Sequence, residues 1–326
     1  MNQDFKQRCG CTTMEAYAGR TIAALRETIG GQKVMCALSG GVDSTVCAVL
    51  LHKAVGKQLT CVFVDHGLMR KDEPAEVERM GQALGMNLVH VNARAEFYAN
   101  LANITDPEQK RKIIGETFIR VFERESKKIG KVGFLAQGTI YPDIIESGSG
   151  GAKLVKSHHN VGGLPDVVDF DEIVEPLRML YKDEVRQLGL VLGIGKALVW
   201  RQPFPGPGLG VRILDAITPE RVATLQAADA IFREEIAAAG LEREIGQYFA
   251  VLTNVKSVGV TDGARTHDAV VALRAVQTKD FMAAAFVPLP WELLGRVAAR
   301  IVNEVPGVGR VVYDVTNKPP GTIEWQ

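Results

Sequence analysis

The segment SGGVDST at residues 39–45 combines glycines, hydroxyl side chains and one carboxylate. It follows an apolar run at 34–38 and precedes VCAVLLHKAV, which has the composition of a helix. Glycines 40 and 41 let the backbone approach an anion closely, and the first amides of a helix can donate to that anion. The P-loop pattern GxxxxGK[ST] is absent. The segment therefore predicts a phosphate site that needs no lysine of its own.

Asp43 is out of place beside a bare phosphate, because a carboxylate repels it. A bridging divalent cation removes the repulsion, and Mg²⁺ prefers hard oxygen ligands. We therefore expect Asp43 to bind magnesium, with the hydroxyls of Ser39, Ser44 and Thr45 at the phosphate oxygens. The alternative is a glycine turn whose Asp and Ser cap a helix. That alternative explains one carboxylate and one hydroxyl, but not the whole group.

The composition excludes several kinds of partner. Lys+Arg and Asp+Glu both total 38 in 326 residues, so no net field draws the molecule to nucleic acid or to an anionic membrane. No leader peptide and no bilayer-spanning run is recognisable, so we expect a cytoplasmic protein that acts on a small molecule. The odd number of cysteines, confined to the first fifth of the chain, predicts reduced thiols: Cys9, Cys11, Cys36, Cys47 and Cys61. Cys9 and Cys11 have metal-binding spacing, but no second pair completes a tetrahedral site.

The first two thirds of the chain alternate in type. The capping box Thr12–Glu15 predicts a first helix, and Pro176 predicts another that runs to Leu188. Continuously apolar strands, separated by helical stretches, are expected at 34–38, 59–64, 88–91 and 132–136. This order predicts an α/β fold whose parallel sheet carries helices on both faces. Ligands then bind beyond the carboxyl ends of the strands, at 39–44, 65–70 and 137–146.

The segment RQPFPGPGLG at 201–210 predicts a linker between two domains, because its prolines and glycines oppose regular structure. Beyond it, strands are expected at 211–214, 248–255, 270–276 and 310–313, with helices from 218 and from 289. We therefore predict an N-terminal domain at 1–200 and a small α+β domain at 211–326. The glycine-rich segment 148–163, which includes His158 and His159, is interpreted as an active-site lid or a plain surface excursion.

SGGVDS resembles the signature of the N-type ATP pyrophosphatases, which cleave ATP between its α and β phosphates. The resemblance implies an adenine nucleotide alpha hydrolase-like fold. Further long motifs, in order from about Cys9 to the last residue, resemble the synthetase part of the GMP synthase family. They are VDHGLMRKDE (64–73), FLAQGTIYPDIIES (134–147), KSHHNVGGLP (156–165), EPLRMLYKDEVRQLG (175–189), RQPFPGPGLGVRIL (201–214), THDAVVALRAVQTKDFM (266–282) and IVNEVPGVGRVVYDVTNKPPGTIEW (301–325).

The resemblance implies a two-step ligation. ATP adenylylates the carbon-2 oxygen of xanthosine 5'-phosphate (XMP), and ammonia then displaces AMP to give GMP. It implies ATP binding by Ser39, Gly40, Gly41, Val42, Asp43, Ser44 and Thr45, and catalysis by Asp43, Asp143, Glu146, Lys156 and Lys182. It implies XMP binding by Arg70, Pro205, Gly206, Pro207, Lys318 and Glu324. Alternatively, Arg70 is a solvated charge, and Asp143 and Glu146 only favour a helix N-terminus.

The resemblance also implies partners. The C-terminal domain is expected to form a homodimer, without nucleic acid or membrane. The linker-like segment CGCTTMEAY begins within ten residues of the start, where many GMP synthases carry a glutamine amidotransferase domain instead. We therefore expect free ammonia, or ammonia from a separate glutaminase subunit. The segments 260–269 and 283–286 depart from the family pattern, and we expect changed packing or interface detail there.

Two other functions stay open. Another N-type ATP pyrophosphatase, such as an NAD synthetase or a tRNA thiolase, would carry the same loop. A thiolase would need a reactive cysteine pair and a basic RNA surface, and neither is evident. A nucleotide-binding protein without turnover would also keep the fold, but intact Asp43 and Lys182 argue against it.

Overall fold

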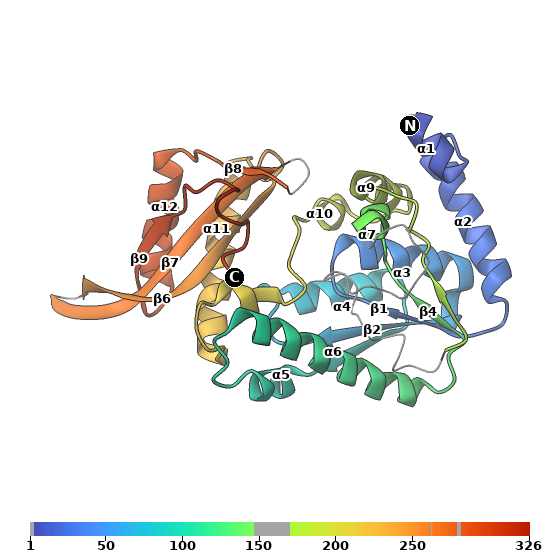
Figure 1. Ribbon diagram of the computed structural model, residues 1–326, viewed down its shortest axis with the longest axis horizontal. Coiled ribbons are helices and arrows are strands. Elements are labelled where there is room, and N and C mark those ends of the chain that lie inside the picture. Colours follow the sequence, from blue (N-terminus) through green and yellow to red (C-terminus); the bar gives the residue numbers. More distant parts are fainter. Residues whose placement is uncertain (1–2, 147–169, 262, 279–281) are drawn as a thin grey trace. The chain divides into compact units, whose positions relative to one another are not determined.

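The computed structural model describes residues 3–146, 170–261, 263–278 and 282–326. The chain divides into two compact units, drawn in Figure 1. The first unit comprises Met1–Asp65, Glu73–Ala93 and Gly115–Arg201, and the second comprises His66–Asp72, Arg94–Ile114 and Gln202–Gln326. The second unit thus takes in two segments from the N-terminal half of the chain. The domain boundaries expected from the sequence stay a prediction.

The first unit is built on a five-stranded parallel sheet with the order β3-β2-β1-β4-β5. Its strands are β1 (Val34–Ala37), β2 (Leu59–Asp65), β3 (Leu88–Asn92), β4 (Phe134–Ala136) and β5 (Glu172–Val174). The first four confirm the strands expected from continuous apolar runs. Sequence reasoning missed β5 because it is only three residues long and begins with an exposed glutamate.

Helices cover both faces of this sheet, as predicted. The β1–α3–β2 and β3–α6–β4 connections cross the sheet in opposite directions, so right-handed crossovers place α3 (Val42–Val55) and α6 (Pro107–Ile129) on opposite faces (Figure 1). Helices α2 (Met14–Ile29) and α9 (Lys182–Val191) pack against α3. The other helices of the described residues up to 201 are α1 (Gln3–Cys9), η1 (Gly56–Gln58), α4 (Glu73–Ala83), α5 (Arg94–Asn100), α7 (Tyr141–Glu146) and α10 (Lys196–Val199).

Two helix starts differ from the prediction. Thr13, not Thr12, caps α2, because its hydroxyl accepts a hydrogen bond from the Ala16 amide at 3.2 Å. The helix expected from Pro176 begins only at Lys182. Leu177 and Leu180 are buried from a turn that precedes α9, so apolar spacing continued beyond the helix and misplaced its start.

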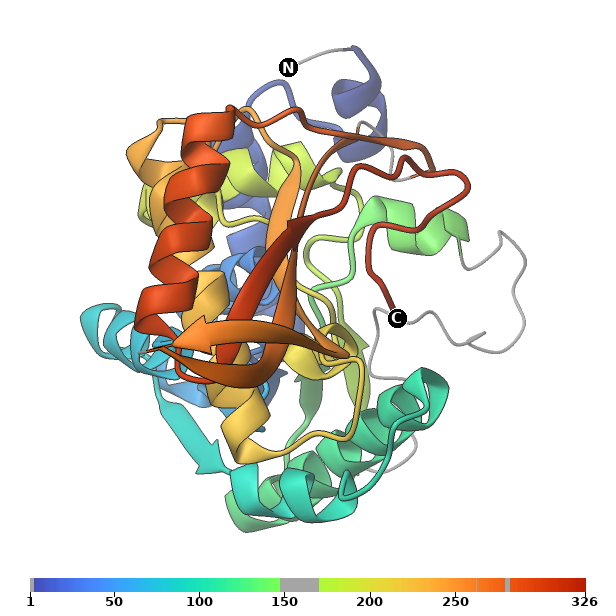
Figure 2. The same cartoon turned by 90° about the vertical axis from the view of Figure 1, so that its left-hand side faces the viewer.

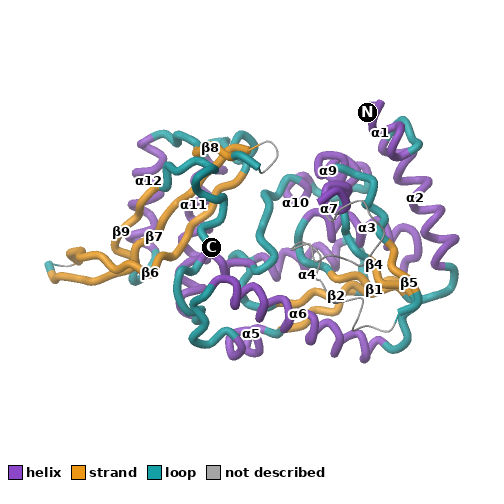
Figure 3. The backbone as a smooth tube through the Cα atoms, in the orientation of Figure 1, coloured by secondary structure: helices purple, strands orange, loops and turns teal. Residues whose placement is uncertain are grey.

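The second unit contains a four-stranded sheet in which β7 is central. Its strands are β6 (Gln247–Thr261), β7 (Ala264–Thr278), β8 (Ala284–Phe286) and β9 (Val308–Tyr313). β7 pairs antiparallel with β6 and β8 and parallel with β9. Figure 3 shows β6 and β7 as one long hairpin. Helices α11 (Pro219–Ala238) and α12 (Trp291–Glu304) pack on each other and against β6 and β9 respectively (Figure 2).

The expected strand at 211–214 is wrong. Residues Gly208–Arg212 form the 3₁₀ helix η2, and only Ile213 makes a single bridge, to Leu252. The helices expected from 218 and 289 are confirmed as α11 and α12. Thr218 caps α11 by accepting a hydrogen bond from the Arg221 amide at 3.3 Å.

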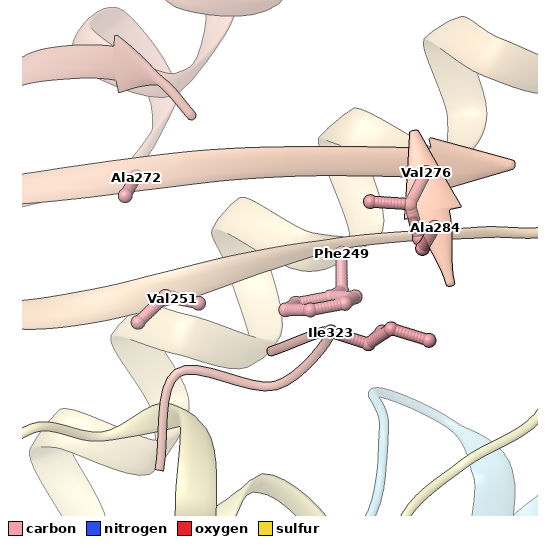
Figure 4. Packing of buried hydrophobic residues seen from close by; sticks show 6 residues of the cluster. All are labelled: Phe249, Val251, Ala272, Val276, Ala284 and Ile323. Atoms are coloured by element: carbon pink, nitrogen blue, oxygen red, sulfur yellow. The ribbon is translucent and has the colours of Figure 1, made fainter. Parts of the chain in front are cut away.

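The C-terminal segment packs on the sheet of the second unit. Figure 4 shows Ile323 next to Phe249 of β6, in a buried cluster with further residues of β6, β7 and β8. The cluster consists of Phe249, Val251, Ala272, Val276, Ala284 and Ile323. The last residues of the chain are therefore part of a folded core. Among the helices of the described residues, none is both long and apolar enough to cross a membrane.

Candidate active site

The loop at residues 39–41 lies at the point where the direction of the chain through the sheet reverses. β1 has β2 on one side and β4 on the other, so the connections that leave the carboxyl ends of β1 and β4 run to opposite sides, and a crevice is expected between them. Ser39 follows β1 closely, and α3 begins at Val42. The strand order alone therefore places the SGGVDST segment where parallel sheets bind their ligands.

The loop is closed by its own hydroxyl groups. The Oγ atoms of Ser39 and Ser44 lie 3.0 Å apart, and the Ser44 hydroxyl donates to the Gly41 carbonyl at 3.1 Å. Gly40 has a φ of 80°, which strongly favours glycine, and Gly41 is the N-cap residue of α3. The first amides of the helix have no partner within the helix, so this turn stands at the positive end of α3.

The backbone at Gly138, which follows β4, lies close to the start of α3, where a glycine fits best because it has no Cβ atom. A Cβ atom at Gly138 would lie 3.2 Å from both the Asp43 carbonyl carbon and the Ser44 nitrogen. A side chain there would push the start of α3 away from the sheet. The segment after β4 thus supports the loop from the other side of the crevice.

Asp43 and Lys182 are brought together, although 139 residues separate them. The Lys182 Nζ donates to the Asp43 Oδ2 at 2.5 Å. The Asp43 Oδ1 is buried and has no hydrogen-bond partner within the described part of the chain. A carboxylate with one such oxygen fits a magnesium ion whose other ligands are phosphate oxygens and water. The described residues contain no group of three or more His, Cys, Asp or Glu side chains that would form an all-protein metal cage.

Residues expected to bind the acceptor assemble within the second unit. Arg70 is buried, and its guanidinium carbon lies 4.3 Å from the centre of the Phe204 ring. The Arg212 guanidinium carbon lies 5.4 Å from the same ring. Both carboxylate oxygens of Glu324 accept hydrogen bonds from Arg212, at 2.7 and 3.0 Å. Arg70 is therefore not a solvated charge, and it shares an aromatic neighbour with the partner of Glu324.

The other expected acceptor residues lie near the same segments. Pro205, Gly206 and Pro207 form a turn before η2, closed by a hydrogen bond from the Gly208 amide to the Pro205 carbonyl at 2.8 Å. Lys318 pairs through its backbone with Ala284, at 2.8 and 3.0 Å. The backbone of the C-terminal segment thus holds Lys318 against the edge strand β8.

Comparison with known proteins decides the family of each part. Residues 14–113 match the model of the PP-loop domain, and residues 234–325 match that of the GMP synthase C terminal domain. The chain thus carries a PP-loop domain and a GMP synthase C-terminal domain. It is 63% identical over 324 residues to "GMP synthase [glutamine-hydrolyzing]" of Clostridium botulinum (strain Eklund 17B / Type B), covering 98% of this chain and 63% of the relative.

Two other relatives are similar to this chain in sequence identity and in coverage. The proteins of the same name from Ruminiclostridium cellulolyticum and Acetivibrio thermocellus are 60% and 58% identical over 322 and 330 residues. These matches cover 98% and 100% of this chain, and 63% and 65% of the relatives. The chain thus spans less than two thirds of the length of these curated relatives. Together with the parallel sheet, the matches confirm an α/β ATP pyrophosphatase fold.

Of the three other predicted catalytic residues, Asp143 is the one whose side chain the structure describes. The Asp143 Oδ2 accepts a hydrogen bond from the Ile140 amide at 2.9 Å, an interaction that favours the start of α7. The side chain of Glu146 and the whole of Lys156 lie outside the described residues. The same holds for the expected lid at 148–163, with His158 and His159.

Sequence reasoning missed several arginine and lysine residues that hold these sites. Arg201 contacts the PP-loop, Arg212 binds Glu324, and Arg274 and Lys110 bind the C-terminal segment. Arg201 and Arg212 stand in the RQPFPGPGLGVRIL motif, which is their only sequence signal. Burial lowers the pKa of Lys110 to about 8, although its Nζ donates to the Ile213 carbonyl at 2.5 Å.

The cysteines behave as buried, reduced side chains. All five are free and buried. Burial raises the pKa of the Cys9 thiol to about 11, so this group is a weak nucleophile and a weak metal ligand near neutral pH.

Proposed function

We propose that this chain is the synthetase part of a GMP synthase, a ligase that forms a carbon–nitrogen bond. ATP adenylylates the carbon-2 oxygen of XMP with release of pyrophosphate, and ammonia then displaces AMP to give GMP. The observation that carries the proposal is the combination, in one chain, of a closed PP-loop with its Asp43–Lys182 pair and a C-terminal domain that matches GMP synthase. That second match favours GMP synthase over an NAD synthetase or a tRNA thiolase.

In the first step, the loop stabilises the leaving pyrophosphate. The hydroxyls of Ser39, Ser44 and Thr45, with the first amides of α3, donate to its oxygens, where negative charge develops. Lys182 supplies a cation beside the same turn. Asp43 would hold magnesium through its unpartnered Oδ1, and the ion supplies charge that offsets the phosphates.

The acceptor residues divide between the phosphate and the purine of XMP. Lys318 suits the phosphate, because a lysine is a compact point charge. Each Glu324 oxygen has a second lone pair beyond the one that Arg212 uses, so Glu324 can still accept from the purine ring. The Arg212 Nη1 is buried without a partner among the described residues, which suits an acceptor oxygen of the ligand. Arg70 and the turn at 205–207 are the remaining residues that we propose to bind XMP.

The nitrogen source and the assembly belong to the same proposal. Ammonia is the attacking nucleophile, either free or delivered by a glutaminase subunit. We infer a homodimer formed through the GMP synthase C-terminal domain, whose hairpin exposes Val255, Val258 and Val260. We place the enzyme in the cytoplasm, where purine nucleotides are made.

Product analysis tests the function directly. The purified chain is mixed with ATP, MgCl₂, XMP and an ammonium salt, and nucleotides are separated by chromatography while pyrophosphate is assayed. We expect GMP, AMP and pyrophosphate in equal amounts, and none of them when XMP or magnesium is left out. A parallel reaction with glutamine in place of ammonium tests the nitrogen source. Intact ATP in the complete reaction would contradict the proposal.

A further inference from the structure

We propose that Arg201 is a positioning residue of the PP-loop, which orients the backbone of Gly40 for phosphate binding. The proposal rests on the proposed function, because it takes the phosphates of ATP as the anion. The Arg201 Nη1 donates to the Gly40 carbonyl at 3.1 Å and to the Glu73 Oε1 at 2.6 Å, and its Nη2 pairs with Glu76. One planar side chain thus connects the loop after β1 to the first turn of α4.

The contact acts on the peptide whose direction matters most to an anion. The carbonyl of Gly40 and the amide of Gly41 belong to one planar unit, so holding the oxygen sets the direction of the amide. A carbonyl oxygen turned toward a phosphate would repel it. Two consecutive glycines would by themselves leave this peptide many conformations, whose entropy would be lost when ATP binds; the Gly41 amide, which donates to the Ser39 Oγ at 3.3 Å, restrains it on one side and Arg201 on the other. A guanidinium that already holds the carbonyl removes much of that cost.

Arg201 is poorly placed to bind the phosphate itself. Its side chain is 15% exposed, and Glu73, which is 5% exposed, accepts from the same Nη1 that holds Gly40. With Glu76 on the other nitrogen, two carboxylates neutralise its charge. The guanidinium therefore acts through Gly40 rather than on the ligand. An arginine suits this role because its fork reaches a carbonyl and two carboxylates at once, which one ammonium cannot do with the same geometry.

Arg201 lies at the boundary between the two units of the chain. It is the last residue of the first unit and the first residue of the RQPFPGPGLG segment. The segment that leads to the second unit therefore begins at the residue that holds the PP-loop.

The same helix offers a matched control. Arg26 donates to the carbonyls of Ala54 and Lys53, at 3.0 and 3.2 Å, at the opposite end of α3. It makes the same kind of contact, an arginine on backbone oxygen, far from the loop. Arg201→Lys and Arg26→Lys thus compare an arginine–carbonyl contact beside each end of α3, while Glu73→Gln tests a carboxylate contact of Arg201.

The experiment measures ATP affinity by calorimetry, the KM values for ATP and XMP, and the melting temperature. We expect Arg201→Lys to weaken ATP binding and raise the KM for ATP by about tenfold, the scale of a lost charge-assisted hydrogen bond. The KM for XMP and the melting temperature should stay unchanged. Glu73→Gln should act in the same direction more weakly, and Arg26→Lys should match the wild type.

The outcomes separate this inference from the proposed function. If Arg201→Lys binds ATP as well as the wild type, the inference is overturned even when GMP is formed. A fall in melting temperature with equal losses for ATP and XMP would also overturn it, because it would show a general structural role. A wild type that binds ATP more tightly than Arg201→Lys but forms no GMP supports the inference and rejects the function. A wild type that binds no ATP overturns both.

Discussion

The PP-loop of the first unit and the C-terminal segment of the second unit differ in the share of their hydrogen bonds that is local, although Arg201 and Lys182 also reach the loop from far away in sequence. Hydrogen bonds within the loop join residues at most five positions apart, from Ser39 to Ser44. The C-terminal segment is held by residues far away in sequence: Arg274 donates to Ile323, and Lys110 to Gln326. The comparison teaches that a backbone phosphate site can be encoded in a short motif. The C-terminal segment, which carries two of the residues proposed to bind XMP, depends instead on long-range contacts.

Arg274 is the centre of that support. It is fully buried in β7, and its guanidinium donates to the Asp314 carboxylate and to the carbonyls of Thr316, Thr322 and Ile323, at 2.7 to 2.9 Å. These acceptors flank Lys318 and precede Glu324. Arg274 thus makes more of the hydrogen bonds to the C-terminal segment than Arg212 or Lys110 does, whereas the PP-loop distributes its hydrogen bonds over several short contacts.

The largest expected effect is in the PP-loop itself. Asp43→Asn removes the charge proposed to hold magnesium, which is worth several kcal/mol, so we expect turnover to fall by about 1,000-fold. The fold should survive, because the amide still accepts from Lys182. Steady-state GMP formation at saturating MgCl₂ measures the effect. Asp183→Asn is the control, since that side chain is 80% exposed, and its turnover should not change. Equal turnover of Asp43→Asn and the wild type would contradict the assignment of Asp43 as a magnesium ligand.

The second prediction concerns the support of the C-terminal segment. Arg274→Met leaves Asp314 and three backbone carbonyls without this donor, so we expect the free energy of unfolding to fall by about 3 kcal/mol. Urea unfolding followed by tryptophan fluorescence measures it. XMP affinity should fall as well, while ATP affinity should stay the same.

The control for this prediction is an arginine on the surface of the same unit. Arg300 pairs with Glu234, Glu235 and Glu304 and is 32% exposed, so Arg300→Met should cost less than about 1 kcal/mol. Equal losses in both variants, or a loss of ATP affinity in Arg274→Met, would break the contrast between the two regions.

The third prediction uses the lowered pKa of Lys110. Burial brings this pKa to about 8 in the folded protein, so between about pH 8 and 10 the unfolded chain binds more protons than the folded one. The free energy of unfolding of the wild type should therefore rise with pH relative to Lys110→Met, by at most about 1.4 kcal/mol per pH unit. Urea unfolding across this range measures the difference. The side chain of Lys127 is 72% exposed, so the free energy of unfolding of Lys127→Met should change with pH in the same way as that of the wild type. If the free energies of unfolding of Lys110→Met and the wild type change with pH in the same way, the buried amine does not titrate between about pH 8 and 10.

The smallest expected effect should be equal in the two units. Thr13 caps α2 in the first unit and Thr218 caps α11 in the second, each through one hydrogen bond from a backbone amide. Thr13→Ala and Thr218→Ala should each lower the free energy of unfolding by about 1 kcal/mol. Thermal unfolding of each variant measures it. A much larger loss of unfolding free energy in Thr218→Ala than in Thr13→Ala would mean that helix caps contribute more to stability in the second unit than in the first.

The sequence by itself determined the features that depend on near neighbours. Apolar runs predicted β1 to β4, and their order predicted a parallel sheet with the ligand beyond β1. The glycines and hydroxyls of SGGVDST predicted a phosphate site, because backbone geometry there depends on consecutive residues, and that site stays a prediction. The same local reasoning misplaced the start of α9 and took η2 for a strand, since apolar residues are buried from turns as well as from regular elements.

Only the tertiary structure decided which charged residues meet. Glu324 was expected to face a purine, and the fold shows that both its oxygens already bind Arg212, 112 residues away. Arg201 was assigned to a linker, and it holds Gly40, 161 residues away. Such pairs have no local periodicity to reveal them. They form because burying a guanidinium or a carboxylate is costly unless the fold supplies a partner of opposite charge or a backbone oxygen at the right distance, and that distance is set by the packing of whole elements.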